Sequence, residues 1–217
     1  MISAIKALEL LKDGNRRFVA DRERDARVGA TRRNELTERQ EPFAIVLGCS
    51  DSRVPAEIVF DQGLGDLFVI RVAGNIVAPS QIGSVEFAAE RFHTRLVVVL
   101  GHSGCGAIEA TLDQLKRPAG KQSRNLRAIV DRVRPSVEPL LTTDLRHDQP
   151  TLMQSAVRAN VRASAGHLRH GSDLLEQLIA RDGLLVVGAE YSLETGVVDF
   201  FDGLPSERKR ARARKGR

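Results

Sequence analysis

Cysteine and long apolar runs are both scarce in this sequence. Its 217 residues include two cysteines, too few for a disulfide scaffold, so we expect a reduced, cytoplasmic compartment. The amino-terminal stretch 1–18 is interrupted by Lys6, Glu9, Lys12 and Asp13 and lacks the continuous apolar segment of a signal peptide. No other stretch is apolar over the length that a membrane span requires. From these absences we expect a protein that is neither disulfide-rich, nor secreted, nor membrane-spanning.

Basic charge is concentrated at the carboxyl end. The formal net charge is +5, but the stretch 207–217 alone holds seven basic residues and one acidic residue, which leaves 26 basic and 27 acidic residues elsewhere. We therefore predict one nearly neutral domain over 1–203, large enough for a single core, followed by a basic, disordered tail over 204–217. Such a tail can neutralise nucleic-acid phosphates, but no aromatic-rich groove accompanies it, so a nucleic-acid partner is not expected.

Apolar runs that suit buried strands alternate with stretches that suit helices. This alternation predicts an α/β fold with a mostly parallel central sheet flanked by helices and an antiparallel edge strand near the carboxyl end. Residue spacing in 2–20 favours an amphipathic helix, either an arm that packs on a partner or an ordinary core helix; on pattern alone the core helix is favoured. The expected strands are 43–47, 67–72, 96–100, 184–188 and a last one that ends at 201. The other expected helices are 80–92, 105–116, 123–137 and 152–181, the last interrupted near Gly166 and Gly171, and 144–151 is expected to be a loop.

Metal-ligand residue types follow two of the predicted strands. Cys49 and Asp51 come directly after the first run, and His102 and Cys105 follow the third. The carboxyl ends of parallel strands meet at one edge of an open α/β sheet, where ligands bind. Two sulfurs, one imidazole nitrogen and one carboxylate oxygen suit tetrahedral zinc. Either pair alone is weak evidence, because a buried cysteine is usually a small apolar residue, but together they predict a zinc site.

Arg53 bears on whether that zinc is structural or catalytic. If Asp51 pairs with Arg53 in bidentate fashion, three protein ligands remain and a fourth position opens to water, which is the catalytic pattern. The alternative is that Arg53 only neutralises a buried carboxylate.

The stretches Cys49-Ser50-Asp51-Ser52-Arg53 and His102-Ser103-Gly104-Cys105-Gly106 together resemble the β class of carbonic anhydrases. The resemblance extends to 14–18, 65–69, 71–75 and the carboxyl-terminal strand, and it covers about residues 3–201. It implies a zinc lyase with one zinc per chain, held by Cys49, His102 and Cys105, with Asp51 as a fourth ligand or paired with Arg53. A zinc-bound hydroxide would then hydrate CO2 reversibly to bicarbonate and a proton, and Asp51 would orient it. Two thiolates reduce the acidity of a zinc-bound water relative to three imidazoles, which favours activity at alkaline pH.

The same resemblance implies a substrate pocket and a partner. Its substrate-binding positions are Gln40, Phe68, Ala73, Phe87 and Gly106. The family further implies a homodimer or homotetramer, in which the amino-terminal helix crosses onto the partner and Gln40 and Phe87 face the neighbour's zinc. For Phe68 and Phe87, plain core packing is an equal alternative.

Some members of the family also carry a second bicarbonate pocket, made from a tryptophan, an arginine and a tyrosine. Arg71 and Tyr191 match two of these positions, but Val46 stands at the third and the chain has no tryptophan. The pocket is therefore expected to be incomplete.

Two other functions stay open at this point. Relatives of the family hydrolyse carbon disulfide or carbonyl sulfide with the same fold and metal, and the shape of the access channel separates them. The second is a zinc-stabilised module that uses the basic tail to bind nucleic acid, and such binding would weaken steeply as the salt concentration rises.

Overall fold

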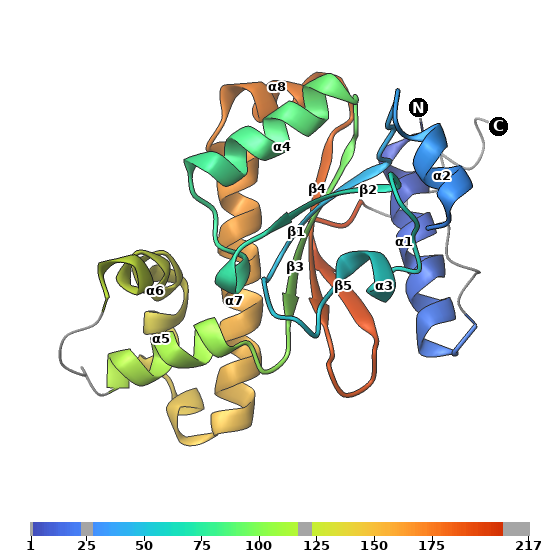
Figure 1. Ribbon diagram of the computed structural model, residues 1–217. Coiled ribbons are helices and arrows are strands. Elements are labelled where there is room, and N and C mark those ends of the chain that lie inside the picture. Colours follow the sequence, from blue (N-terminus) through green and yellow to red (C-terminus); the bar gives the residue numbers. More distant parts are fainter. Residues whose placement is uncertain (1, 23–27, 117–122, 206–217) are drawn as a thin grey trace.

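A computed structural model describes residues 2–22, 28–116 and 123–205. Its centre is a five-stranded sheet in the order β2-β1-β3-β4-β5 (Figure 1). The strands are β1 (Ala44–Gly48), β2 (Leu67–Arg71), β3 (Leu96–His102), β4 (Leu185–Tyr191) and β5 (Val198–Asp202). The first four are parallel, and β5 runs antiparallel to β4. The predicted fold class is confirmed, including the antiparallel edge. The domain boundary at 203 stays a prediction, and nearly all of the predicted tail lies outside the described residues.

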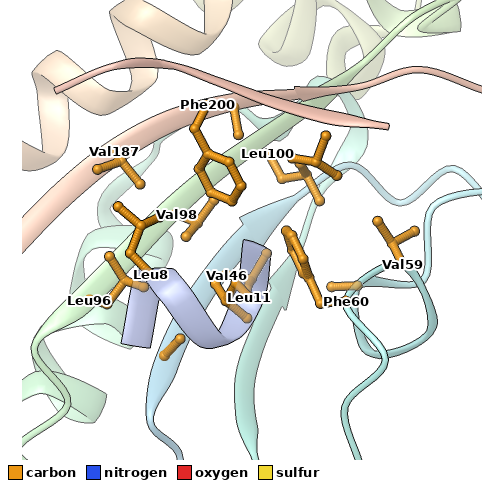
Figure 2. Packing of buried hydrophobic residues seen from close by; sticks show 14 of the residues in the cluster. Leu8, Leu11, Val46, Val59, Phe60, Leu96, Val98, Leu100, Val187 and Phe200 are labelled. Atoms are coloured by element: carbon orange, nitrogen blue, oxygen red, sulfur yellow. The ribbon is translucent and has the colours of Figure 1, made fainter. Parts of the chain in front are cut away.

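One face of the sheet is covered by the amino-terminal helix. Helix α1 (Ala4–Val19) begins after Ser3, whose hydroxyl accepts a hydrogen bond from the Lys6 amide as an N-cap. Leu8 and Leu11 of α1 are buried against Val46 and the short α3 (Ala56–Val59), and Phe200 closes the cluster (Figure 2). The apolar face of α1 is thus used within its own chain, as its residue pattern favours.

The other face is covered by α4 (Pro79–Arg91), α7 (Gln149–His170) and α8 (Asp173–Arg181) (Figure 1). Helix α7 lies very close to the sheet. A side-chain carbon added to Gly101 would come within 2.5 Å of Val161, and one added to Gly188 within 2.8 Å. Glycines on two adjacent strands therefore make room for this helix.

The predicted loop at 144–151 is wrong. A 3-10 turn, η3 (Asp144–His147), occupies its first half, and α7 already begins at Gln149. The physical reason is local: the Asp148 carboxylate caps the Thr151 amide, and Pro150 fits the first turn of a helix, where no amide hydrogen is needed. The expected interruption near Gly166 is also absent, and the helix breaks only at Gly171, between α7 and α8.

A third apolar cluster lies beyond the carboxyl ends of the strands. It joins α5 (Gly106–Lys116), α6 (Arg124–Val137) and the first half of α7, and it includes Cys49 and Cys105. The remaining elements are α2 (Ala30–Glu35), η1 (Ala73–Asn75) and η2 (Glu138–Thr142). Among the helices that the structure describes, none is both long and apolar enough to cross a bilayer.

Candidate metal centre

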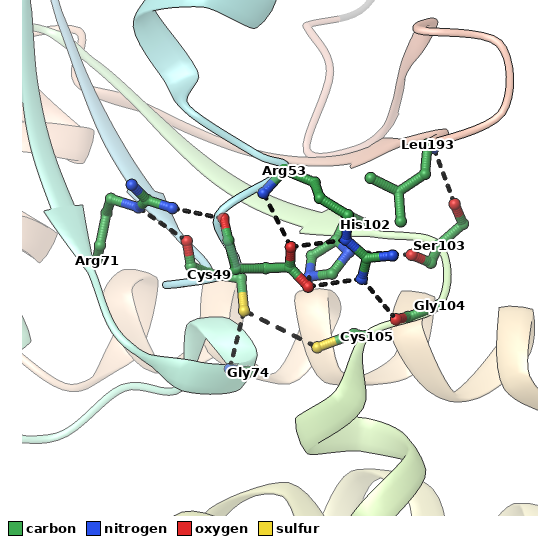
Figure 3. A network of polar contacts seen from close by, with 10 residues as sticks. Cys49, Arg53, Arg71, Gly74, His102, Ser103, Gly104, Cys105 and Leu193 are labelled. Atoms are coloured by element: carbon green, nitrogen blue, oxygen red, sulfur yellow. Dashed lines mark hydrogen bonds and ion pairs between the residues drawn. The ribbon is translucent and has the colours of Figure 1, made fainter.

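Parallel pairing of β1 with β3 brings the two predicted ligand pairs together. Gly48 lies opposite Leu100, so Cys49, directly after β1, and His102, at the end of β3, come to the same edge of the sheet. Cys105 follows in the turn before α5. The ligand atoms of these three residues all lie within 4.8 Å of one another, and all three side chains are buried (Figure 3). Within the described residues this is the only group of three or more such side chains that could hold a metal ion.

The His102 ring is oriented for ligation. Its Nδ1 donates to the carbonyl oxygen of Ser103 at 2.9 Å, so Nε2 carries the free lone pair. Nε2 is buried and has no hydrogen-bond partner. A buried imidazole nitrogen without a partner is costly, and beside two sulfurs it fits a zinc-type cation. The donor set therefore suits the group that the sequence predicts.

The two thiols share a hydrogen bond across an Sγ–Sγ distance of 4.0 Å. Hydrogen bonding from the Cys105 thiol, helped by His102 and by backbone amides, lowers the pKa of Cys49. The same contact, together with burial, raises the pKa of Cys105. Cys49 is therefore the first of the pair to ionise, and a bound cation would favour the loss of the second proton as well.

Asp51 is paired with Arg53. One carboxylate oxygen accepts from Arg53 Nε at 2.9 Å and from the Arg53 amide at 3.0 Å, and the other accepts from Nη2 at 2.7 Å. These hydrogen bonds hold the pKa of Asp51 well below its usual range. The second oxygen lies 3.9 Å from Nε2 of His102. The carboxylate thus borders the cluster of three donors while its hydrogen bonds go to the guanidinium and the backbone amide of Arg53.

Arg71 takes part in the site in a way that the sequence did not indicate. Its Nε donates to the carbonyl oxygen of Cys49 at 3.0 Å and its Nη2 to that of Asp51 at 2.6 Å. Arg71 therefore fixes the loop that carries the first ligand, whereas we expected it in an incomplete anion pocket. Tyr191 and Val46, its expected neighbours there, are buried in the core beneath α1. No signal in the sequence reveals such contacts, because they go to backbone atoms.

The predicted substrate-binding residues fall into two groups. Ala73 precedes Gly74, whose amide donates to Cys49 Sγ, and Gly106 follows Cys105, so both adjoin the centre. Phe68 lies opposite Ile45, near the start of β1, at the other end of the sheet from Cys49.

Gln40 and Phe87 also belong to the distant group. They line a cavity of about 760 Å³ together with Phe92, and Phe87 is 54% exposed. The Phe87 and Phe92 rings meet edge to face at a centroid distance of 5.7 Å. Within one chain, Gln40, Phe68 and Phe87 are therefore not neighbours of the three ligand residues.

Comparison with known proteins identifies the family. The carbonic anhydrase family model matches residues 44–198. A carbonic anhydrase of Mycolicibacterium smegmatis is 40% identical over 199 residues, which are 90% of this chain and 92% of that protein. Carbonic anhydrase 2 of Mycobacterium tuberculosis is 38% identical over 195 residues, 88% of this chain and 90% of that protein.

Solved structures agree with the sequence relatives. The β-carbonic anhydrase CcaA superposes with a TM-score of 0.69 at 26% identity, over 94% of this chain and 91% of that one. A tetrameric β-carbonic anhydrase of Sordaria macrospora has a TM-score of 0.69 at 25% identity, over 77% of this chain and 84% of that one. The chain belongs to the β class of the carbonic anhydrase family, and the resemblance seen in the sequence is confirmed.

Proposed function

We propose that this protein catalyses the reversible hydration of CO2 to bicarbonate and a proton, with one zinc ion per chain held by Cys49, His102 and Cys105. The observation that carries the proposal is the set of three buried donor atoms within 4.8 Å of one another, with Nε2 of His102 left without a protein partner. Membership of the carbonic anhydrase family supports the reaction.

Zinc in such a three-ligand site would supply the Lewis acidity that makes water a nucleophile near neutral pH. The residues of the chain then position the reactants. Ser103 holds the His102 ring through Nδ1, which fixes the tautomer that ligates. Arg53 holds the Asp51 carboxylate beside the ligand atoms and keeps it ionised. In this role Asp51 accepts a hydrogen bond from the reacting water and orients it, while Arg53 prevents Asp51 from completing a closed four-ligand set.

We also propose that the protein self-associates as a homodimer or homotetramer. Solved relatives from Sordaria macrospora are described as tetrameric. Gln40 and Phe87 lie far from the centre of their own chain, so a substrate-binding role for them requires that they face the centre of a second copy. Phe68, which packs against Phe87 at a centroid distance of 6.2 Å, would support that wall. The two buried free thiols favour a reducing compartment, which supports a cytoplasmic location.

The decisive experiment is stopped-flow CO2 hydration by protein of known zinc content between about pH 6.5 and 9. We expect one zinc per chain and turnover that rises with pH, because two thiolates make the cation a weaker Lewis acid than neutral imidazoles do. Cys105→Ser should bind zinc much more weakly and lose activity.

Full zinc content with no CO2 hydration at any pH would contradict the proposal. Activity on carbon disulfide or carbonyl sulfide in that protein would identify the sulfur-containing gases as its substrates. Inactivity on all three gases would indicate a structural zinc.

A further inference from the structure

Cys49 receives a hydrogen bond from a backbone amide in a turn, and a helix far along the sequence holds that turn in place. The amide of Gly74, in η1, donates to Cys49 Sγ at 3.4 Å in a buried contact. Gly74 has a φ of 69° and Asn75 a φ of 41°, so two consecutive residues adopt the left-handed region. Such a turn is intrinsically unfavourable for Asn75 and needs support from its surroundings.

Two polar residues of α7 supply that support. Asn160 Nδ2 donates to the carbonyl oxygen of Gly74 at 2.8 Å, and Ser164 Oγ donates to that of Asn75 at 2.9 Å. Asn160 and Ser164 are 2% and 3% exposed. They lie one turn apart on α7, so their side chains project from the same face of the helix. Both hydrogen bonds thus reach from one helix face to consecutive carbonyl groups of the turn.

The reach of these side chains depends on how close α7 lies to the sheet. Gly101 and Gly188 leave room for Val161, which stands between Asn160 and Ser164 on the helix. The opposite end of the turn is fixed as well, since the Val72 amide donates to the carbonyl oxygen of Gly48 at 3.1 Å, directly before Cys49. The turn is therefore held from both sides, and its Gly74 amide donates to the first predicted ligand.

We propose that Asn160 and Ser164 are positioning residues for the metal centre, which hold η1 so that the Gly74 amide donates to Cys49 Sγ. The inference rests on the proposed zinc site. An amide hydrogen bond to a ligating sulfur withdraws charge from it and fixes its direction, and loss of outer contacts of this kind typically weakens metal binding about 10- to 100-fold. The alternative is that both side chains only satisfy two buried carbonyl groups, in which case they contribute to stability alone.

The test measures zinc affinity and the spectrum of the cobalt(II)-substituted protein. Asn160→Leu removes the donor with little change in shape, and Ser164→Ala removes only a hydroxyl group. We expect each to raise the zinc Kd about tenfold or more in competition with a chromophoric chelator, and to shift the thiolate-to-cobalt charge-transfer bands. Ser164→Thr, which keeps the hydroxyl, should restore both readouts.

Thr94→Val is the matched control. The Thr94 hydroxyl donates to the carbonyl oxygen of Pro42 at 2.7 Å in an equally buried contact, but before β1 and β3 begin rather than at their carboxyl ends. It should lower Tm without shifting the cobalt bands, and its zinc Kd should stay within about twofold of wild type.

If Ser164→Ala lowers Tm but leaves the zinc Kd and the cobalt bands unchanged, the proposal is overturned. Should Asn160→Leu fail to fold, Ser164→Ala and Ser164→Thr decide the question alone. Because the readouts are metal affinity and spectrum, they remain valid for a wild-type protein that binds zinc but does not hydrate CO2. A wild-type protein that binds neither metal would overturn this inference together with the zinc site.

Discussion

At the scale of single residues, the two-point ion pair between Arg53 and Asp51 gives the clearest prediction about catalysis. We predict that Arg53→Ala lowers kcat/KM by about 100-fold or more while zinc is retained, because the freed carboxylate, 3.9 Å from His102 Nε2, can turn inward and become a fourth ligand. Arg53→Lys should recover only part of the loss, since an ammonium group cannot bind both carboxylate oxygens in the fixed geometry of a guanidinium. Stopped-flow kinetics with a zinc assay of each variant measures the effect.

Zinc content separates the two explanations of a slow variant. Lost activity with lost zinc would mean that Arg53 supports the site and does not control Asp51. Full activity in Arg53→Ala would show that the ion pair plays no part in catalysis.

The predicted ligand residues could be proposed from the sequence, whereas the residues that hold them in place could not. Cys49, His102 and Cys105 stand out because soft-metal ligand types directly follow apolar runs. Arg71 and Asn160 act on backbone carbonyl groups, and an arginine or asparagine that does so is indistinguishable in sequence from one that is solvated. The positions of Gln40 and Phe87 came from family resemblance alone, and their predicted role depends on a partner.

At the scale of elements, the contact of α7 with the sheet depends on glycine. We predict that Gly101→Ala destabilises the protein by about 1–3 kcal/mol, because the new methyl group would lie 2.5 Å from Val161 Cγ2. In a chain of this size that lowers Tm by roughly 3–10 °C. Calorimetry measures the change.

Two further variants make the cause specific. Gly166 lies in α7, as Val161 does, and a methyl group added there would meet no atom within 4 Å. Gly166→Ala should therefore raise or maintain Tm. Val161→Ala combined with Gly101→Ala should recover part of the loss, and strictly additive effects of the pair would refute the steric explanation.

Strand β4 carries a buried carboxylate, Glu190, whose effect on the free energy of unfolding depends on pH. Burial raises the pKa of Glu190, although Arg158 lies 3.4 Å away. A raised pKa means that the folded state binds the proton more tightly than the unfolded state, so stability falls as pH rises from about 4.3, the unfolded value, through the folded pKa. We predict that Glu190→Gln has little effect on Tm near that lower value and raises Tm at neutral pH, where Arg158 keeps Asp199 as a partner at 2.7 Å.

Thermal unfolding of both proteins across this pH range is the measurement. A glutamine variant that is less stable than wild type at neutral pH would mean that the pair with Arg158 outweighs the cost of burial.

Elements were predictable where burial is continuous and were missed where capping decides. Strands β1, β3 and β4 followed from unbroken apolar runs, since a parallel strand buried on both faces has no polar alternation. The start of α7 did not, because Asp148 and Pro150 look like loop residues until their role at a helix terminus is seen. Gly166 failed to interrupt the helix because an isolated glycine costs only about 1 kcal/mol, which tertiary packing offsets.

At the scale of the whole molecule, the cavity beside Phe87 is the region that a second copy should cover. We predict that Phe87→Glu shifts the protein to a smaller species in sedimentation velocity, because it places a charge on an exposed aromatic group next to Phe92. If the cavity faces the partner's centre, this dissociation should also lower the rate of CO2 hydration, while the zinc content per chain stays unchanged.

Leu126→Glu is the matched control. Leu126 lies on α6 and is 56% exposed, but it does not line the cavity. Its variant should keep the wild-type assembly. Equal dissociation in both variants would argue against this cavity as the interface.

The position of the predicted ligands at the carboxyl ends of β1 and β3 also determines when the site can form. Cys49 and Cys105 are brought together only by pairing of the two central strands, and β3 gains its other neighbour from β4, which lies near the end of the chain. Long-range parallel pairing closes large loops and forms slowly. During synthesis the centre therefore cannot form before both central strands are available and have paired. If zinc binds there as proposed, it would join only after these strands have paired, so it would act mainly on the rate of unfolding and would mark chains whose central strands are in place.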